Sequence, residues 1–254
     1  MAFMHCRLHS KELKKAVEVN VVYPTASGTP DKLLYLLHGL SDDASIWMRR
    51  TSVERYAERR NIAVVMPDGG RGFYTDAVSG ERYWSYISEE LPALMHGIFK
   101  LPERRKDTFA AGLSMGGYGA LKLGLRCPGR FAAVGALSAV TDVKYRLRAA
   151  DTEAWRTELR RIFGGGSRLA ADGNDLFALA GDATGSGKRL PKIISFCGTE
   201  DRLLRDNRKF AAHLRRLNYP EFYAYERPGA HTWEFWDAHI TEVLDFFISG
   251  RLPE

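Results

Sequence analysis

The stretch from Thr108 to Gly119, TFAAGLSMGGYG, decides the fold. A short run, TFAA, leads into Gly112-Leu113-Ser114-Met115-Gly116, and a helix-forming run, ALKLGL, follows. This pattern predicts a buried strand, a sharp turn at Ser114 and a helix that begins at once. Glycines flank the serine because such a turn strains its backbone and leaves room only for small neighbours. We therefore expect Ser114 Oγ to protrude at the carboxyl edge of a sheet, placed to act as a nucleophile.

On both sides of this stretch, apolar β-like runs alternate with longer amphipathic segments. The expected strands cover residues 17–23, 33–39, 62–69, 108–114, 132–139, 192–198 and 222–229. The expected helices cover residues 44–60, 88–100, 114–128, 203–218 and 232–250. Several of the strands are nearly continuous apolar runs, as in parallel sheets that are covered on both faces. The alternation predicts an α/β protein with a mostly parallel central sheet and helices on both faces. The sharp turn expected at Ser114 narrows this to the α/β-hydrolase fold.

The chain has 254 residues, 45% of them apolar, and a formal net charge of +6. This composition excludes a disordered or collagenous chain, and we expect a single domain over residues 1–254. Residues 141–190 break the alternation, with one short helix candidate at 153–164 and no strand signal. We interpret this segment as a small insertion or lid over the carboxyl edge of the sheet, with a plain surface excursion as the alternative.

The charge pattern and the cysteines limit the partners that we expect. Basic residues come as scattered pairs with acidic residues close by, as on solvated helix faces, so we expect no nucleic-acid partner. No apolar run is long enough for a membrane span or for the core of a signal peptide. Cys6, Cys127 and Cys197 form no close-spaced pair, which argues against a disulfide framework and a zinc site. We therefore expect a cytoplasmic protein without a membrane partner or a bound metal.

A serine nucleophile needs a base within hydrogen-bond reach and a carboxylate that orients the base. In the α/β-hydrolase order the acid and then the histidine follow the serine, each in a loop after a strand. His231 is the one histidine after Ser114 that lies in a strand-to-helix loop. The acid is expected after the preceding strand, where the sequence GTED favours Asp201 over Glu200. Weaker candidates, which no strand leads into, are Asp175 and Asp182.

The oxyanion that develops on the substrate needs preorganised N–H donors. We predict the backbone N–H of Met115, the residue after the nucleophile, as one donor. The second is the N–H of Leu40, in the turn after the expected strand at 33–39. His38, at the end of that strand, is expected to make a structural hydrogen bond rather than to act as a base.

Aromatic residues occur in several of the loops that should surround Ser114. Trp47, Tyr74 and Trp233 are predicted to line a pocket for the acyl or leaving group, and Trp236 lies near them in the sequence. Ordinary core or rim packing is the alternative, since Trp233 and Trp236 have the spacing of one helix face.

These motifs together resemble the tributyrin-esterase branch of the esterase D family. The resemblance is carried by LLHGLSDDASIW, FAAGLSMGGYGALKLGL, CGTEDRLL and GAHTWEFWDAHI, and it extends from about residue 16 to 248. It implies a serine carboxylesterase for short-chain acyl esters that works through an acyl-enzyme intermediate without a cofactor. In such an enzyme the catalytic triad would be Ser114, Asp201 and His231, and the oxyanion loop would include Leu40.

The same family groups S-formylglutathione hydrolases with relatives of feruloyl esterases. A thioesterase of that type, or an acetyl or feruloyl esterase on decorated sugars, therefore stays an alternative. S-formylglutathione hydrolases usually continue their HGL with a Thr-Cys stretch, whereas Ser41-Asp42-Asp43 follows here, which favours an oxygen ester. A catalytically silent binding module is a further alternative. The expected partner is a small-molecule ester, and the sequence leaves a homo-oligomer open.

Overall fold

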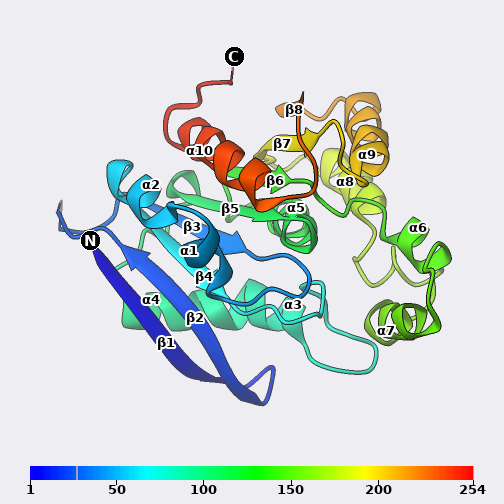
Figure 1. Ribbon diagram of the computed structural model, residues 1–254, viewed down its shortest axis with the longest axis horizontal. Helices are drawn as coiled ribbons and strands as arrows, with labels where there is room; N and C mark the ends of the chain where they lie inside the picture. The colour runs from blue at the N-terminus through cyan, green and yellow to red at the C-terminus, as the bar shows by residue number, and fades with distance from the viewer. Residues whose placement is uncertain (27, 254) are drawn as a thin grey trace.

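One sheet organises the computed structural model, which describes residues 1–26 and 28–253 (Figure 1). Within those residues the sheet has eight strands in the spatial order β1-β2-β4-β3-β5-β6-β7-β8. The strands are β1 (Ala2–Ser10), β2 (Lys15–Tyr23), β3 (Lys32–Leu37), β4 (Ile62–Pro67), β5 (Thr108–Leu113), β6 (Ala133–Leu137), β7 (Lys192–Gly198) and β8 (Phe222–Arg227). β2 pairs antiparallel with both β1 and β4, whereas all pairs from β4 across to β8 are parallel. The predicted α/β fold is confirmed.

Helices cover both faces of the sheet, and each face buries its own hydrophobic cluster. α1, α2 and α10 pack on one face, where they contribute Ile46, Val53 and Ile240. The other face is covered by helices that include α4, α5 and α9. The helices are α1 (Ile46–Arg50), α2 (Val53–Arg59), α3 (Tyr83–Ser85), α4 (Leu91–Ile98), α5 (Met115–Arg126), α6 (Val143–Arg148), α7 (Glu153–Phe163), α8 (Leu176–Gly185), α9 (Leu204–Arg216) and α10 (Trp233–Ser249), with a π-helical turn (Tyr86–Glu90) and a 3₁₀ turn (Arg105–Asp107). In the described part of the chain, no helix is both long enough and apolar enough to cross a membrane.

Two local expectations were wrong. β1 was not predicted, although its side chains alternate between half-buried and exposed, and Met4, Cys6 and Leu8 pack against the core. The single helix expected at 44–60 is broken into α1 and α2. The break occurs at Thr51, which has extended backbone and whose hydroxyl donates a 2.6 Å hydrogen bond to the carbonyl of Trp47. A threonine that bonds back to the preceding turn competes with the helix for this acceptor.

Residues 141–190 contain more regular structure than predicted. Three short helices, α6, α7 and α8, lie here instead of one. Each begins with a side-chain cap, in which Asp142, Thr152 or Asp175 accepts a backbone N–H from the first turn. These capping residues resemble loop composition in the sequence, which explains why two of the helices were missed. α6 and α7 place side chains in a cavity that also contains Ser114, at the carboxyl edge of the sheet.

Candidate active site

Ser114 lies at the turn between β5 and α5, in a backbone conformation that L-residues rarely adopt. Its φ is 52° and its ψ is −113°. The turn is locked by the chain itself, because the N–H of Ser114 donates to Leu137 O at 2.8 Å and its carbonyl accepts from the N–H of Val140 at 3.0 Å. Gly116 completes the turn, since a Cβ at this position would overlap the carbonyl oxygen of Leu37. The strain is thus held by the surrounding backbone, as expected of a reactive serine.

His231 lies in the loop between β8 and α10, with its ring between Ser114 and Asp201. Its Nδ1 is 2.8 Å from Asp201 Oδ2, and its Nε2 is 3.1 Å from Ser114 Oγ. Because the carboxylate can only accept, the neutral ring carries its proton on Nδ1 and presents the lone pair of Nε2 to the serine hydroxyl. The three residues that the sequence predicts for the triad are therefore brought together in one hydrogen-bonded chain.

Asp201 lies in the loop after β7 and is 5% exposed. Its Oδ1 accepts the N–H of Leu203 at 2.8 Å, and the hydroxyl of Ser138 is a further hydrogen-bond partner. Burial alone would raise the pKa of this carboxyl, but the hydrogen bonds from His231 and these neighbours hold the pKa below its usual range. Asp201 is thus kept ionised and oriented toward the ring of His231.

The loops that carry Asp201 and His231 are joined by their backbones. The N–H of Thr199 donates to Arg227 O at 2.8 Å, and the N–H of Glu200 donates to Gly229 O at 2.9 Å. Any side chain at Gly198 would collide with the carbonyl of Gly229. The parallel pairing of β7 and β8 therefore continues past the strand ends and sets the distance between acid and histidine.

The two predicted oxyanion donors flank the serine. Leu40 lies beside Ser114 in two cavities, and Met115 lines one of them as the first residue of α5. Within residues 1–26 and 28–253, no backbone acceptor takes the N–H of Leu40 or of Met115. N–H groups at a helix start and in a tight turn are left free for an anionic oxygen.

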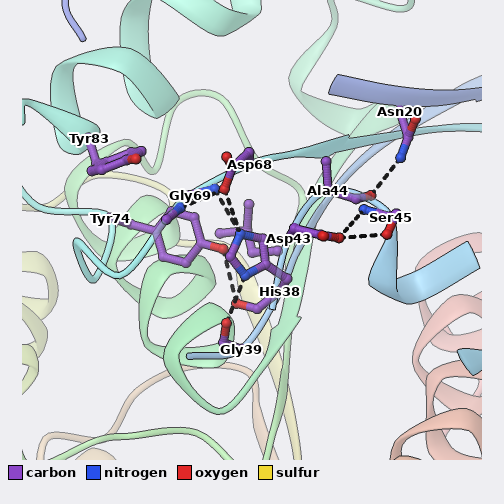
Figure 2. A network of polar contacts seen from close by, with 12 residues as sticks. Asn20, His38, Gly39, Asp43, Ala44, Ser45, Asp68, Gly69, Tyr74 and Tyr83 are labelled. Carbon is purple, nitrogen blue, oxygen red and sulfur yellow. Dashed lines mark hydrogen bonds and ion pairs between the residues drawn. The ribbon is translucent and has the colours of Figure 1, made fainter. Parts of the chain in front are cut away.

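His38 holds the loop that carries Leu40 in place through hydrogen bonds, which Figure 2 shows. The N–H of Gly69 donates to His38 Nε2 at 2.8 Å, so Nδ1 carries the proton and donates to Gly39 O at 2.7 Å. Tyr74 donates its hydroxyl to His38 O at 3.0 Å. This arrangement agrees with the structural hydrogen bond predicted for His38, which serves the loop rather than the substrate.

The far side of the same loop is held independently. Asn20 of β2 donates its amide to Ala44 O at 2.9 Å, and Asp43 accepts the N–H of Ser45 at 2.8 Å (Figure 2). Asn20 is itself buried. The turn that presents Leu40 is therefore fixed at both of its ends.

The aromatic residues divide between cleft and core. Trp233 lines a cleft of about 450 Å³ together with Ser114 and His231. The expectation for Trp47 and Tyr74 was wrong, because they are 1% and 0% exposed. The Trp47 indole N–H donates to Leu37 O at 3.1 Å, which ties it to the sheet. Both side chains therefore point into the core and not into the cleft.

Two further residues support the site: Ser138, which was not predicted, and Trp236, which the sequence placed near the predicted pocket residues. Ser138, after β6, is fully buried, and its hydroxyl accepts the indole N–H of Trp236 at 3.1 Å while it also hydrogen-bonds Asp201. The Trp236 ring meets the His231 ring edge to face, with centroids 4.8 Å apart. In the described residues, no group of three or more His, Cys, Asp or Glu side chains could hold a metal ion.

Comparisons with known proteins identify a matching family and several similar relatives. The model of the family described as "Putative esterase" matches residues 10–247. An acetyl esterase of Caldicellulosiruptor saccharolyticus is 30% identical over 97% of this chain and 98% of its own length. Substrate-bound FphF, a fluorophosphonate-binding serine hydrolase of Staphylococcus aureus, is 33% identical with a TM-score of 0.89, covering 98% of each chain.

A second solved structure, the S-formylglutathione hydrolase FrmB of Staphylococcus aureus, is 32% identical with a TM-score of 0.86. It covers 98% of this chain and 99% of its own. The family model alone spans most of the chain, and the sequence relative is matched nearly end to end. The chain therefore belongs to this esterase family, and it is a carboxylic ester hydrolase of the serine-esterase type.

Proposed function

We propose that this esterase hydrolyses short-chain acyl esters through an acyl-enzyme intermediate, with Ser114, His231 and Asp201 as its triad. The observation that carries the proposal is the continuous chain of contacts from Ser114 Oγ to His231 Nε2 at 3.1 Å and from Nδ1 to Asp201 at 2.8 Å. A serine hydroxyl is a weak nucleophile, and this arrangement supplies both the base and its orienting acid.

In the first step Ser114 Oγ attacks the carbonyl carbon while His231 Nε2 takes the hydroxyl proton. Asp201 stabilises the imidazolium that forms, without itself becoming protonated. His231 then gives the proton to the leaving alkoxide, and the acyl group stays on the serine. Water attacks the acyl-enzyme in the second step, with His231 again as the base, and Ser114 is released with the acid.

The negative charge on the tetrahedral oxygen is met by the N–H groups of Leu40 and Met115. Both are free donors in the described chain, and the loop of Leu40 is pinned by His38 and Asn20. Donors that are already oriented stabilise the transition state without a reorganisation cost. Removing one such donor costs about 10²- to 10³-fold in kcat in a comparable enzyme.

Replacement of the nucleophile tests the proposal. Ser114→Ala should lower kcat for p-nitrophenyl acetate and butyrate by roughly 10⁶-fold, because the triad acts as a unit. A fluorophosphonate probe should label the wild-type protein at Ser114 and leave the variant unlabelled. Equal hydrolysis by the two proteins would refute the proposal, and a wild-type protein that neither hydrolyses nor labels would instead favour a silent binding module.

A thioesterase activity is the second candidate, favoured by the 32% identity to FrmB. The Ser41-Asp42-Asp43 sequence after the HGL motif favours an oxygen ester, and with it the tributyrin-esterase branch. A panel of tributyrin, acetylated sugar, feruloyl ester and S-formylglutathione, compared by kcat/KM, separates these candidates. The substrate with the highest kcat/KM identifies the branch.

A further inference from the structure

Two chambers meet at Ser114. One, of about 450 Å³, is lined by His231, Trp233 and Trp236. The other, of about 340 Å³, is lined by Met115, Phe73, Val140 and Trp155, without His231. The residues that line both chambers are Leu40, Ser114 and Arg202.

If the proposed function holds, the position of His231 indicates which chamber takes the leaving group and which takes the acyl chain. The general acid must lie within hydrogen-bond reach of the leaving oxygen, so the leaving group occupies the chamber that contains His231. The acyl carbon is bonded to Ser114, and its chain must extend away from the leaving group. We propose that the acyl chain occupies the chamber of Met115 and Val140, and that Trp155 of α7 limits the length of that chain.

Trp155 is the large apolar side chain that residues 141–190 contribute to this chamber. It is half-buried, and its ring centroid lies 6.2 Å from that of Phe73, which is 3% exposed. Phe73 in turn meets Phe163, at the other end of α7, with ring centroids 5.4 Å apart. The wall is thus part of a packed aromatic cluster.

The helix that carries Trp155 is docked on the loop after β4. The N–H groups of Val78 and Ser79 each donate a 3.0 Å hydrogen bond to carbonyls at the end of α7. Arg71 of the same loop binds Glu158 of α7 with two hydrogen bonds of 2.6 and 2.8 Å. Because backbone bonds and a two-point ion pair hold α7, Trp155 presents a fixed wall to the acyl chain.

The chamber is larger than an acetyl group requires. Taking about 30 Å³ for each water-sized group, the three heavy atoms of acetyl need roughly 90 Å³. Val140 and Leu203 form apolar walls of the space next to Ser114, and the charged side chains of Asp151 and Arg202 also line it. Arg146 lines the chamber too, but its charge is neutralised by an ion pair with Asp206. An unbranched aliphatic acyl chain longer than acetyl fits the apolar part of this lining.

Paired variants of two tryptophans test the assignment. Trp155 and Trp233 are both half-buried, lie in the first turns of their helices and line different chambers. For p-nitrophenyl acetate, butyrate, hexanoate and octanoate, kcat/KM is measured for wild type, Trp155→Ala and Trp233→Ala. Trp155→Ala should raise the octanoate-to-butyrate ratio by about tenfold, the usual effect of freeing room for methylene groups in an apolar pocket.

Trp233→Ala should leave the acyl-length ratio within twofold and should instead change the preference between phenyl and alkyl leaving groups at constant acyl chain. The deacylation rate, which no longer involves the leaving group, should respond to acyl length differently in Trp155→Ala than in wild type. A second variant, Trp155→Phe, should give an intermediate octanoate-to-butyrate ratio. It provides the test if the alanine variant does not fold.

Two outcomes overturn the inference. One is a folded Trp155 variant whose acyl-length ratio equals that of wild type, and the other is a shift of acyl-length preference in Trp233→Ala instead. Failure of the proposed function is seen separately, because it appears as hydrolysis by Ser114→Ala and does not depend on either tryptophan.

Discussion

The loops that end β5, β7 and β8 differ from residues 141–190 in what holds them. Backbone contacts set the three loops, through hydrogen bonds such as that from Glu200 N–H to Gly229 O and through glycines where no Cβ fits. Apart from the two backbone bonds that Val78 and Ser79 donate to the end of α7, residues 141–190 are attached to the rest of the molecule largely through side chains. Ion pairs of this kind join Arg71 to Glu158, Arg146 to Asp206 and Lys209 to Asp142.

The two kinds of contact match two proposed tasks: catalysis by the three loops and substrate selectivity by residues 141–190. Backbone contacts tolerate little change, and they hold the groups that the proposed reaction needs within hydrogen-bond distance. Side-chain contacts can be exchanged one at a time, and together with the two backbone bonds to α7 they position the walls of the proposed acyl chamber. Variants that disturb the first region should therefore abolish activity, whereas variants in the second should change stability or substrate preference.

After Ser114→Ala, the largest effect is expected at Asp201. Asp201→Asn keeps the shape of the side chain, but the amide can donate to His231 and favour the wrong tautomer of the ring. By analogy with the corresponding change in a serine protease, kcat should fall by about 10⁴-fold with little change in stability. Steady-state hydrolysis of p-nitrophenyl butyrate measures this loss.

Glu200→Gln is the matched control for Asp201→Asn. Glu200 is adjacent to Asp201 but exposed, so the control variant should keep nearly all of its kcat. A large loss in Glu200→Gln together with an active Asp201→Asn would reverse the assignment of the acid.

An intermediate effect is expected at Lys122, where the two regions meet. Lys122 of α5 is 0% exposed, and its Nζ donates to Tyr74 O, Thr75 Oγ1 and Asn174 Oδ1 at 3.1, 2.9 and 2.6 Å. Lys122→Met keeps the volume but removes the donors from these buried acceptors. The free energy of unfolding should fall by about 3 kcal/mol, since each unsatisfied buried group costs about 1–3 kcal/mol.

Urea unfolding measures the effect at Lys122, and Lys188→Met serves as its control. Lys188 is exposed within residues 141–190, so its replacement should change the unfolding free energy by less than about 0.5 kcal/mol. Equal urea midpoints for the two variants would show that the buried Lys122 side chain does not join the regions.

The sequence predicts the placement of the candidate triad because each residue directly follows a recognisable strand. Trp47 and Tyr74 show the limit of this reasoning. The segments that carry them, α1 and the loop after β4, contribute other residues near the site, but the direction of a side chain depends on packing that one sequence does not reveal. Ser138 shows a related limit, because nothing in the sequence around a single serine after a strand indicates that it will contact Asp201.

The fold was predictable where burial is uniform. β4, β5 and β6 are buried along their whole length and appear in the sequence as continuous apolar runs. Lys122 lies in the helical run ALKLGL, where a lysine is expected to face solvent. It is buried instead because Tyr118 and Trp84 pack around its side-chain nitrogen, with the ring centroids 5.5 and 4.8 Å from Nζ. The local spacing of apolar residues does not reveal which side chains from other elements will cover a position.

The smallest effect is expected at the ion pair between Arg71 and Glu158. Arg71→Gln removes both hydrogen bonds, but the Arg71 side chain is 47% exposed and therefore screened by water and salt. The unfolding free energy should fall by at most about 1 kcal/mol, and the loss should shrink in high salt. The N–H groups of Val78 and Ser79 still hold the end of α7 in this variant, so the wall of Trp155 should move little.

A double-mutant cycle with Glu158→Gln isolates the pair from other effects of each change. Its coupling energy should stay below about 1 kcal/mol, as for other exposed pairs, while the octanoate-to-butyrate ratio should change by less than in Trp155→Ala. A coupling of several kcal/mol, or a change in acyl preference as large as that of Trp155→Ala, would mean that side-chain contacts and not the backbone bonds position α7. In that case one surface ion pair would control the size of the acyl chamber. Residues 141–190, held by side chains, would then differ even more from the three catalytic loops, which backbone contacts hold.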